Sequence, residues 1–392
     1  MENNYETVCL CALNSIFGYE PRVASALIEN LGSASAVFEM SDADKDAVFG
    51  PYSKYRGKIV KKDLDAAEAV LQRLRRDGTV FVGITSDEYP KRLKGCEDAP
   101  LGIFVRSDSP VERIFAGTEH YVAVVGTREI TPYGEQWCRD IVRTLAGSGA
   151  APCIVSGLAY GTDIIAHRTA VECGLPTIAV MATGTDTVYP GRHRGFAEHL
   201  AGLPGCALVT DYPPGTAPVA LNFIRRNRII AGLSDSVILV ESAVKGGGMI
   251  TGRLAFSYNR SVYALPGRGD DSRSQGCNHL IREGVAEIID SLDGLNVQLG
   301  LCEKGRGCGG MQGCCRIVRG DLTERYSRTL PEDKIAAMTA VLLKVRERRG
   351  IDFDGLCDAT GLPYRSVAEV VALLENDGMI SVDLLRRCSI RG

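Results

Sequence analysis

Residues 222–241, NFIRRNRIIAGLSDSVILVE, join a dense basic cluster to a segment typical of a buried strand. Three arginines fall within positions 225–228 of a chain whose formal net charge is −3, so the cluster is a local feature and not a result of composition. The planar arginine fork suits phosphate, and Phe223 offers a face on which a base could stack. An isolated basic triplet is most often a solvated helix face, but this one opens an α/β unit among glycine-rich turns.

Between residues 121 and 294, strand-like segments alternate with glycine-bearing turns and helical segments. This alternation predicts an α/β fold with a doubly wound, mostly parallel sheet and helices on both faces. Ligands of such sheets bind at the carboxyl ends of the strands. The expected strands are Val122–Val125, Cys153–Val155, Thr177–Val180, Ala207–Thr210, Val237–Val240 and Ser261–Ala264.

Composition indicates an ordinary globular protein of two or three domains, with 392 residues that are 45% hydrophobic and 24% charged. The sequence has no run of about 18 apolar residues, and its start, MENNYETVCL, lacks the basic region of a signal peptide. We therefore expect a cytoplasmic protein without a membrane segment. The 14 cysteines then fit reduced thiols better than a disulfide framework.

Two flanking regions precede the α/β part. Residues 1–80 show helical spacing of apolar residues, and the GYEPRV turn at 18–23 resembles a helix-hairpin-helix or SAM-like bundle. Such a bundle either contacts nucleic acid or serves as a packing and partner module. Residues 81–120 are expected to be an irregular connector with short strands at Val80–Ile84 and Ile103–Val105.

Two further regions follow the α/β part. Residues 295–329 form a glycine- and cysteine-rich linker, in which Cys302, Cys308, Cys314 and Cys315 lack the two-residue loops of ordinary zinc sites, so no metal is expected. Residues 330–392 predict a helix-turn-helix with the start of a wing. Such a winged helix suggests DNA binding, but its second helix, Tyr364–Glu375, carries one basic residue, which favours a protein partner.

Candidate binding residues gather in the turns that follow the expected strands. Thr131 and Pro132 suit the start of a helix, whose free amides beside Arg128 would form an anion site; a tight turn that merely needs glycine is the alternative. His167, on an expected helix, is more typical of a structural residue than of a base. The candidate DNA-binding residues are Gly126, Thr127, Arg128, Ser156, Gly157, Arg192, Arg194, Asn222, Phe223, Arg225, Arg226, Asn227, Arg228, Lys245, Gly247 and Gly248.

Motifs of several enzyme classes are missing from the sequence. It has no Walker-type phosphate loop, no evident carboxylate cluster for two catalytic metals and no G-x-S-x-G nucleophile turn. Arginines and glycine loops without a nucleophile or base favour a phosphate-backbone binder. We therefore expect no enzymatic activity and no cofactor.

Seven motifs in order resemble the DNA-processing protein A (DprA, or Smf) family. They are GTREITPYG at 126–134, SGLAYGTDIIAH at 156–167, DTVYPGRH at 186–193, DYPPG at 211–215, FIRRNRIIAGLSDSVILVES at 223–242, GGGMIT at 246–251 and LPG at 265–267. The resemblance implies an extended Rossmann-type domain that binds single-stranded DNA during natural transformation, protects it and loads the RecA recombinase onto it. It also implies a homodimer formed through that domain.

The match is uneven at single residues. Arg128 and the F-x-x-R-N-R residues from Phe223 onward follow the family pattern, and Arg192 or Arg194 supplies a cation after Tyr-Pro. Ala220 stands where some members have lysine, and Arg225 could substitute for it. A Rossmann-fold nucleotide phosphoribohydrolase is the alternative, but its P-G-G-x-G-T-x-x-E motif is not matched here.

Overall fold

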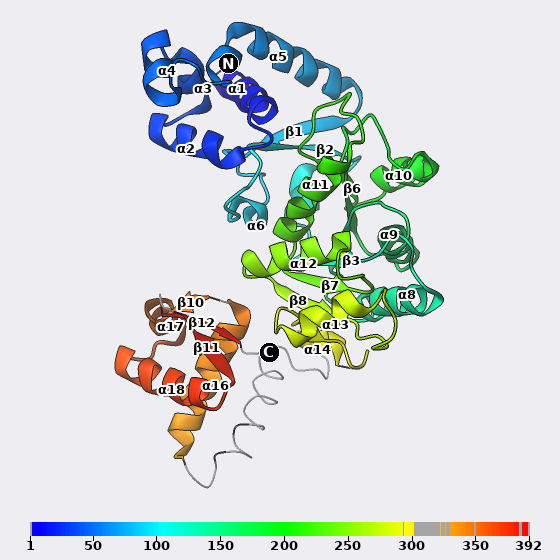
Figure 1. Cartoon of the computed structure of the whole chain (residues 1–392), viewed down its shortest axis with the longest axis vertical. Helices are drawn as coiled ribbons and strands as arrows, with labels where there is room; N and C mark the ends of the chain where they lie inside the picture. Colours follow the sequence, from blue (N-terminus) through cyan, green and yellow to red (C-terminus); the bar gives the residue numbers. More distant parts are fainter. Residues whose placement is uncertain are drawn as a thin grey trace.

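A computed structural model of the chain describes residues 2–292, 294–301, 322, 326, 330–348, 350–383 and 386–390 (Figure 1). Its centre is a nine-stranded sheet with the strand order β1-β2-β6-β5-β4-β3-β7-β8-β9. The strands are β1 (Thr79–Gly83), β2 (Gly102–Arg106), β3 (Tyr121–Val125), β4 (Cys153–Ser156), β5 (Thr177–Val180), β6 (Ala207–Thr210), β7 (Ser236–Leu239), β8 (Ser261–Ala264) and β9 (Glu287–Ile288).

The pairing of the strands makes this a doubly wound sheet. Strands β6, β5, β4, β3, β7, β8 and β9 pair in parallel, with Ala123 opposite both Val155 and Val237 in the middle of the sheet. The chain builds outward from β3 to β6, crosses back through a helix and continues from β7 to β9. The order of strands therefore reverses between β3 and β7, and a ligand site is expected at their carboxyl ends.

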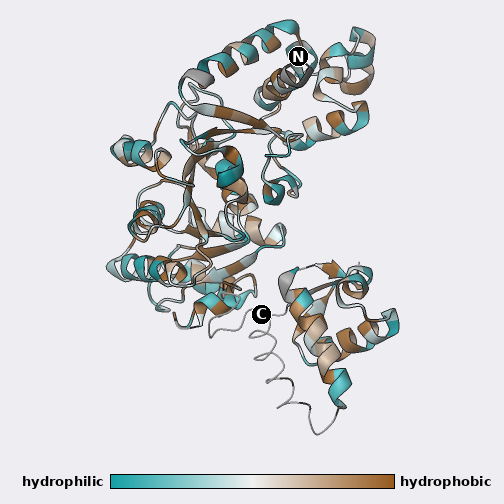
Figure 2. Ribbon diagram, turned by 180° about the vertical axis from the view of Figure 1, so that it is seen from behind, coloured by the Kyte–Doolittle hydropathy of each residue, from teal (hydrophilic) through white to brown (hydrophobic). Residues whose placement is uncertain are grey.

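Helices cover both faces of the sheet. One face packs against α8 (Pro132–Ala146), α9 (Thr162–Glu172), α10 (Arg194–Ala201) and α14 (Leu295–Gln298). The other packs against α6 (Lys91–Lys94), α7 (Val111–Ala116), α11 (Ala220–Leu233), α12 (Gly247–Ser257) and α13 (Gln275–Arg282). The strands are hydrophobic along both faces, as a sheet buried on two sides requires, and the outer helix surfaces are largely hydrophilic (Figure 2).

The N-terminal unit is helical, as expected. It comprises α1 (Glu2–Ile16), α2 (Pro21–Leu31), α3 (Ala34–Glu39), α4 (Asp42–Phe49), the short 3-10 helix η1 (Arg56–Lys58) and α5 (Lys61–Arg76). Its core includes Phe17 and continues onto Phe81 of β1 and Phe104 of β2. Since β2 also pairs antiparallel with β6, the segment expected as a separate connector, 81–120, belongs to the main sheet.

The C-terminal module has its own core and a three-stranded sheet of order β10-β12-β11. Its elements are α16 (Glu332–Glu347), β10 (Ile351–Asp352), α17 (Phe353–Thr360), α18 (Tyr364–Asn376), β11 (Ile380–Val382) and β12 (Arg387–Ile390). This order agrees with the helix-turn-helix expectation, and the winged-helix assignment stays a prediction. The cysteines at 302, 308, 314 and 315, for which no metal was expected, lie outside the described residues.

Within the described ranges, no helix is long and apolar enough to cross a membrane.

Candidate nucleic-acid interface

The candidate site lies at the carboxyl ends of β3, β4, β5 and β7, where four loops and the first turns of α11 meet. The loops after β3 and β7 are joined by a hydrogen bond from the Thr127 amide to the Glu241 carbonyl (2.8 Å). Gly126 permits this packing, because a Cβ there would lie 2.3 Å from Thr162 Oγ1. The switch point of the sheet thus brings together loops that are far apart in the sequence.

Three side chains form a stack on the surface of this edge. The Arg128 guanidinium lies over the Phe223 ring, 5.0 Å from its centroid. The Tyr189 ring meets Phe223 edge-on, with 5.3 Å between centroids and 65° between planes. Arg128 is exposed, Tyr189 is 46% exposed and Phe223 is partly exposed. The stack therefore presents one cation and two aromatic rings to solvent.

Tyr189 was not among the residues selected from the sequence, and neither was Tyr160. Tyr160 is also exposed and meets the His193 ring edge-on at 4.9 Å. His193 itself is buried, and its Nδ1 donates a hydrogen bond to the Leu158 carbonyl (2.8 Å). The signal for Tyr189 was present in the DTVYPGRH motif, from which Arg192 was selected as a candidate and Tyr189 was not.

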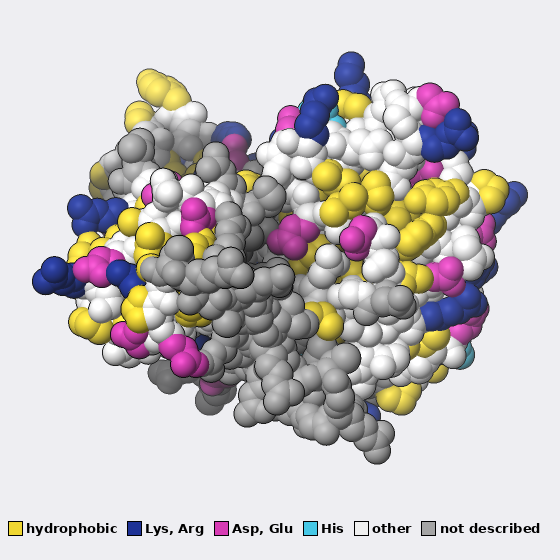
Figure 3. Space-filling view, turned by 90° about the horizontal axis from the view of Figure 1, so that it is seen from below, with side chains coloured by type: hydrophobic (Ala, Val, Ile, Leu, Met, Phe, Trp, Pro, Cys, Tyr) yellow, Lys and Arg dark blue, Asp and Glu magenta, His cyan; other side chains and the backbone are white. Residues whose placement is uncertain are grey.

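Exposed cations also lie in the loops at this edge of the sheet. Arg192 and Arg194 come shortly after Tyr189 and Pro190, in the 3-10 helix η2 (Gly191–His193) and at the start of α10. Both are exposed and have no hydrogen-bond or ion-pair partner among the described residues. Lys245 is exposed in the same way in the loop after β7. Figure 3 shows one end of the molecule, where basic and acidic side chains are interspersed.

Arg226 is placed differently from the prediction, because its side chain is buried beneath this surface and is only 3% exposed. Its Nη1 donates to the Val180 carbonyl at the end of β5 (2.7 Å). The guanidinium lies against Gly157 so closely that a Cβ on this glycine would be 1.8 Å from Nη1. Gly157 is thus required by the packing of Arg226, and Arg226 joins α11 to the ends of β4 and β5.

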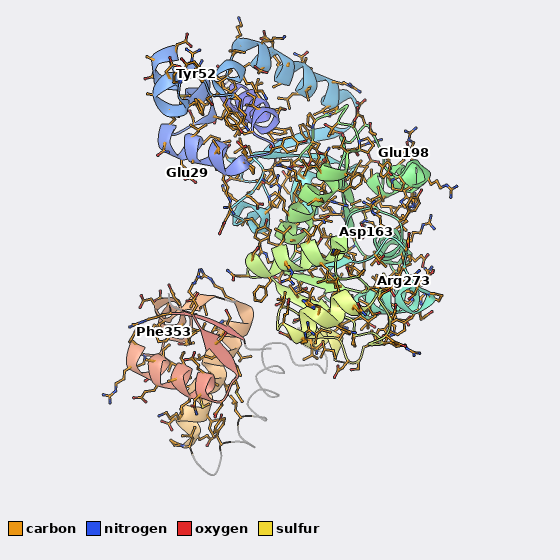
Figure 4. All side chains as sticks on the ribbon, viewed as in Figure 1. Glu29, Tyr52, Asp163, Glu198, Arg273 and Phe353 are labelled. Carbon is orange, nitrogen blue, oxygen red and sulfur yellow. The ribbon has the colours of Figure 1, made fainter. Side chains whose placement is uncertain are left out.

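Burial shifts the pKa values of two ionisable side chains near Arg226, Asp163 and His167. Loss of solvent raises the pKa of Asp163, and the nearby Arg226 guanidinium opposes this shift. Asp163 lies near the middle of the α/β domain in Figure 4. Burial, with Arg226 and His193 nearby, lowers the pKa of His167 to about 3. His167 Nδ1 pairs with Thr177 Oγ1 (2.7 Å), whose hydroxyl donates to the Ile154 carbonyl (2.7 Å), so His167 is a neutral structural residue.

Arg228, Arg225 and Asn222 also make contacts within the protein. Arg228 Nη2 forms a buried ion pair with Asp211 Oδ2 (2.5 Å), which removes this guanidinium from the surface. Arg225 donates to the carbonyls of Gly18 and Tyr19 in the N-terminal unit. Asn222 is buried, and its Oδ1 accepts a hydrogen bond from the Tyr19 hydroxyl (3.2 Å). The structure thus buries Arg228 beneath the predicted DNA surface, its contact with DNA stays a prediction, and Arg225 and Asn222 connect two units of the chain.

The anion site expected at the start of α8 is filled by a side chain of the protein. The Thr131 amide and hydroxyl donate to the buried Glu241 carboxylate, each at 2.8 Å. Thr131 Oγ1 in turn accepts from the Gly134 amide (3.1 Å), which confirms Thr131 as the cap. Because Glu241 supplies the negative charge at this helix end, no external anion is needed there.

The glycine loop at 245–248 borders the same edge. Gly248 lies next to the β3 loop, since a Cβ on it would be 3.5 Å from the Gly126 Cα, whereas a Cβ on Gly247 would meet open space. Asn227 Nδ2 donates to the Gly247 carbonyl (3.4 Å) and fixes this loop on α11. Ser156 is buried and donates to the Val124 carbonyl (2.7 Å), so its role is in the sheet.

No group of three or more histidine, cysteine, aspartate or glutamate side chains suited to a metal ion occurs in the part of the chain that the structure describes. What this edge offers chemically is an aromatic face, exposed cations and exposed loop backbone.

Comparison with known proteins finds a family profile that matches the region containing this site. The sequence profile of the DNA recombination-mediator protein A family matches residues 80–300, which is more than half of the chain. The chain belongs to this family. The match starts within β1. The region shared with the family therefore includes the edge strands β1 and β2, which were expected from the sequence to belong to a connector.

Individual relatives agree with this assignment. Protein Smf of Synechocystis is 36% identical over 382 residues, which cover 92% of this chain and 93% of the relative. Protein Smf of Escherichia coli is 39% identical over 235 residues, or 60% of this chain and 61% of the relative. The match to the E. coli protein thus spans less than two thirds of its length.

Two solved structures share the fold. The X-ray structure of DNA processing protein A from Streptococcus pneumoniae has a TM-score of 0.59 at 28% identity and covers 75% of this chain and 95% of that one. The Helicobacter pylori protein, described for its single-stranded DNA binding mode, has a TM-score of 0.50 at 30% identity and covers 56% of this chain and 95% of that one. These likenesses confirm the α/β fold class.

Proposed function

We propose that this protein binds single-stranded DNA at the carboxyl edge of its main sheet. The observation that carries the proposal is the surface stack of Arg128, Phe223 and Tyr189. Exposed rings can stack on unpaired bases whatever their identity, at about 1–3 kcal/mol for each base. Arg192, Arg194 and Lys245 would attract the phosphates beside these bases. The family relative from H. pylori, which is described as binding single-stranded DNA, supports the same function.

The stack favours single strands over duplex DNA for a physical reason. In a duplex the faces of the bases are already stacked on one another, so Phe223 and Tyr189 could reach them only after the helix opens. Opening a base out of a duplex costs a few kcal/mol. A single strand carries no such cost, and its backbone can follow the loops at this edge.

The test compares one labelled oligo-dT with a duplex of the same length in a gel-shift or anisotropy titration at fixed salt. We expect the single strand to bind at least tenfold more tightly. Equal affinity for both would contradict the proposal, because it would indicate phosphate attraction alone. Release of free base from a nucleoside monophosphate would instead support the phosphoribohydrolase alternative.

We further infer a role in DNA processing during natural transformation, in the cytoplasm. In this role the protein protects incoming single strands and loads the RecA recombinase onto them, without catalysing a reaction itself. The family description as a recombination mediator supports this inference, as do relatives named DNA processing protein DprA in Bacillus subtilis and Streptococcus pneumoniae. Strand exchange by RecA on DNA coated with single-strand-binding protein, with and without this protein, tests the loading step.

A further inference from the structure

Beyond the surface stack, two aromatic rings of the N-terminal unit, Tyr19 and Tyr55, are each paired with a cation. Arg225 lies over the Tyr19 ring at 4.0 Å from its centroid, and Lys54 Nζ lies over the Tyr55 ring at 4.6 Å. Each pair repeats the chemistry of Arg128 on Phe223. The first pair is carried by α11, the helix that also carries Phe223 of the proposed DNA site, and the second is joined to the first by an ion pair beside Tyr19.

The first link joins α11 to the turn between α1 and α2. Phe223 and Arg225 are two residues apart on α11, and Arg225 Nη1 donates to the Tyr19 carbonyl (3.1 Å). Asn222, next to Phe223, accepts from the Tyr19 hydroxyl (3.2 Å). Tyr19 is nevertheless 56% exposed, so part of its ring is open to a ligand.

The second link joins this turn to the loop between α4 and α5. Lys54 Nζ pairs with Glu20 Oε1 at 3.0 Å, directly beside Tyr19. Tyr55 stacks on Phe17 of the N-terminal core with 4.5 Å between centroids, which holds the loop in place. Tyr52 of the same loop is 99% exposed and lies at the outer end of the N-terminal unit (Figure 4).

The charge of this loop also fits a polyanion. Glu20 and Asp46 neutralise Lys54 and Arg56 through ion pairs. Lys58, Lys61 and Lys62, however, are exposed and have no ion-pair partner in the described part of the chain. Residues 50–62 contain no acidic side chain. An exposed ring beside unpaired cations matches the combination of base stacking and phosphate attraction that single-strand binders use.

We propose that the N-terminal helical unit is a second contact region for single-stranded DNA, reached by the strand as it leaves the Phe223 site across Tyr19. Tyr52 stacks a base there, and Lys58 and Lys61 attract phosphates. This inference rests on the proposed function of the carboxyl edge and adds an extension of the binding site onto a different domain. It predicts that a long strand gains contacts that a short strand cannot make.

The experiment measures the affinity of the full chain for an oligo-dT of about six nucleotides and one of about twenty, the range over which single-strand sites typically fill. The test variants are Tyr52→Ala and the double change Lys58→Gln with Lys61→Gln. Lys94→Gln is the matched control, since Lys94 is an exposed lysine on α6, whose neighbour Arg92 pairs with Asp235 at the amino end of β7. It therefore removes one lysine charge, where the double variant removes two, at the opposite edge of the sheet.

We expect wild type to prefer the long oligonucleotide and both test variants to lose about tenfold in affinity for it. Their affinity for the short one should stay at the wild-type value, and Lys94→Gln should change neither. Two outcomes would overturn the inference: equal wild-type affinity for both lengths, or test variants that bind the long strand as wild type does. Failure of wild type to bind either length would overturn the proposed function itself. Tyr52 is fully exposed, so loss of folding does not complicate its substitution.

Discussion

Replacement of Arg226 by alanine tests whether this arginine has a structural role or binds DNA. In the structure its guanidinium is buried, donates to the Val180 carbonyl at 2.7 Å and offsets the buried charge of Asp163. Without Arg226 the buried Val180 carbonyl loses its donor, and a buried polar group left unsatisfied costs about 1–3 kcal/mol. We therefore expect Arg226→Ala to lower the free energy of unfolding by at least about this amount at neutral pH, with a further contribution from the charge near Asp163.

The loss of stability in Arg226→Ala should depend on pH, because the pKa of Asp163 is shifted by burial. Burial raises the pKa of this carboxyl, so the folded state binds its proton more tightly than the unfolded state does. Asp163 therefore stabilises the folded state most below the ordinary aspartate pKa of about 3.9, where it is protonated in both states. This contribution is lost as pH rises through the raised pKa of the folded state. Without Arg226 the pKa rises further, because the opposing positive charge is gone. The deficit of Arg226→Ala should consequently shrink in acid and grow toward neutral pH.

Chemical denaturation of wild type and Arg226→Ala at about pH 5 and pH 7.5 measures this difference. The salt dependence of oligo-dT binding should keep the wild-type slope, because a buried guanidinium releases no counterion. A variant of unchanged stability whose slope is shallower by about 0.7 would refute the reasoning. It would place the guanidinium on a phosphate, as the sequence had suggested. Arg192→Ala, which removes an exposed arginine without a partner in the described residues, is the matched control.

The remaining predictions concern three other parts of the protein. Arg192→Ala and Arg194→Ala should each reduce the slope of log K against log salt by about 0.7 in oligo-dT titrations, with unchanged thermal stability; an unchanged slope would exclude a phosphate contact. Deletion of 330–392 should leave single-strand affinity within a few-fold, since α18 carries few cations, and a hundredfold loss would place the module in the DNA site. The α/β domain should dimerise, giving two pockets along one strand; light scattering that shows a monomer at tens of micromolar would count against this.

Much of the fold could be predicted from the sequence because buried parallel strands carry a strong local signal. Thr177–Val180, Ala207–Thr210 and Ser261–Ala264 were predicted with the bounds they have in the structure. The short β9 was missed, because two residues carry almost no periodicity. The place of β1 and β2 in the main sheet was also missed, since antiparallel pairing with β6 depends on contacts far along the chain.

The site was predicted less completely than the fold, because a basic residue in a sequence does not disclose its burial. The arginines of 225–228 have three different environments. Arg225 contacts the N-terminal unit, Arg226 is buried against the Val180 carbonyl, and Arg228 is buried in an ion pair with Asp211. Their roles depend on Gly157 and Asp211, which come from other strands. Glu241 shows the same limit, since nothing local indicates that its carboxylate occupies the start of α8.

The most direct test of the proposed DNA surface is the affinity of Phe223→Ala for oligo-dT at several salt concentrations. The Phe223 ring is the centre of the stack, in contact with both Arg128 and Tyr189. Its loss should weaken binding by about 1–3 kcal/mol and leave the salt slope unchanged, because a ring contributes stacking and no charge. Wild-type affinity in Phe223→Ala would contradict the account and place the single-strand site elsewhere on the protein.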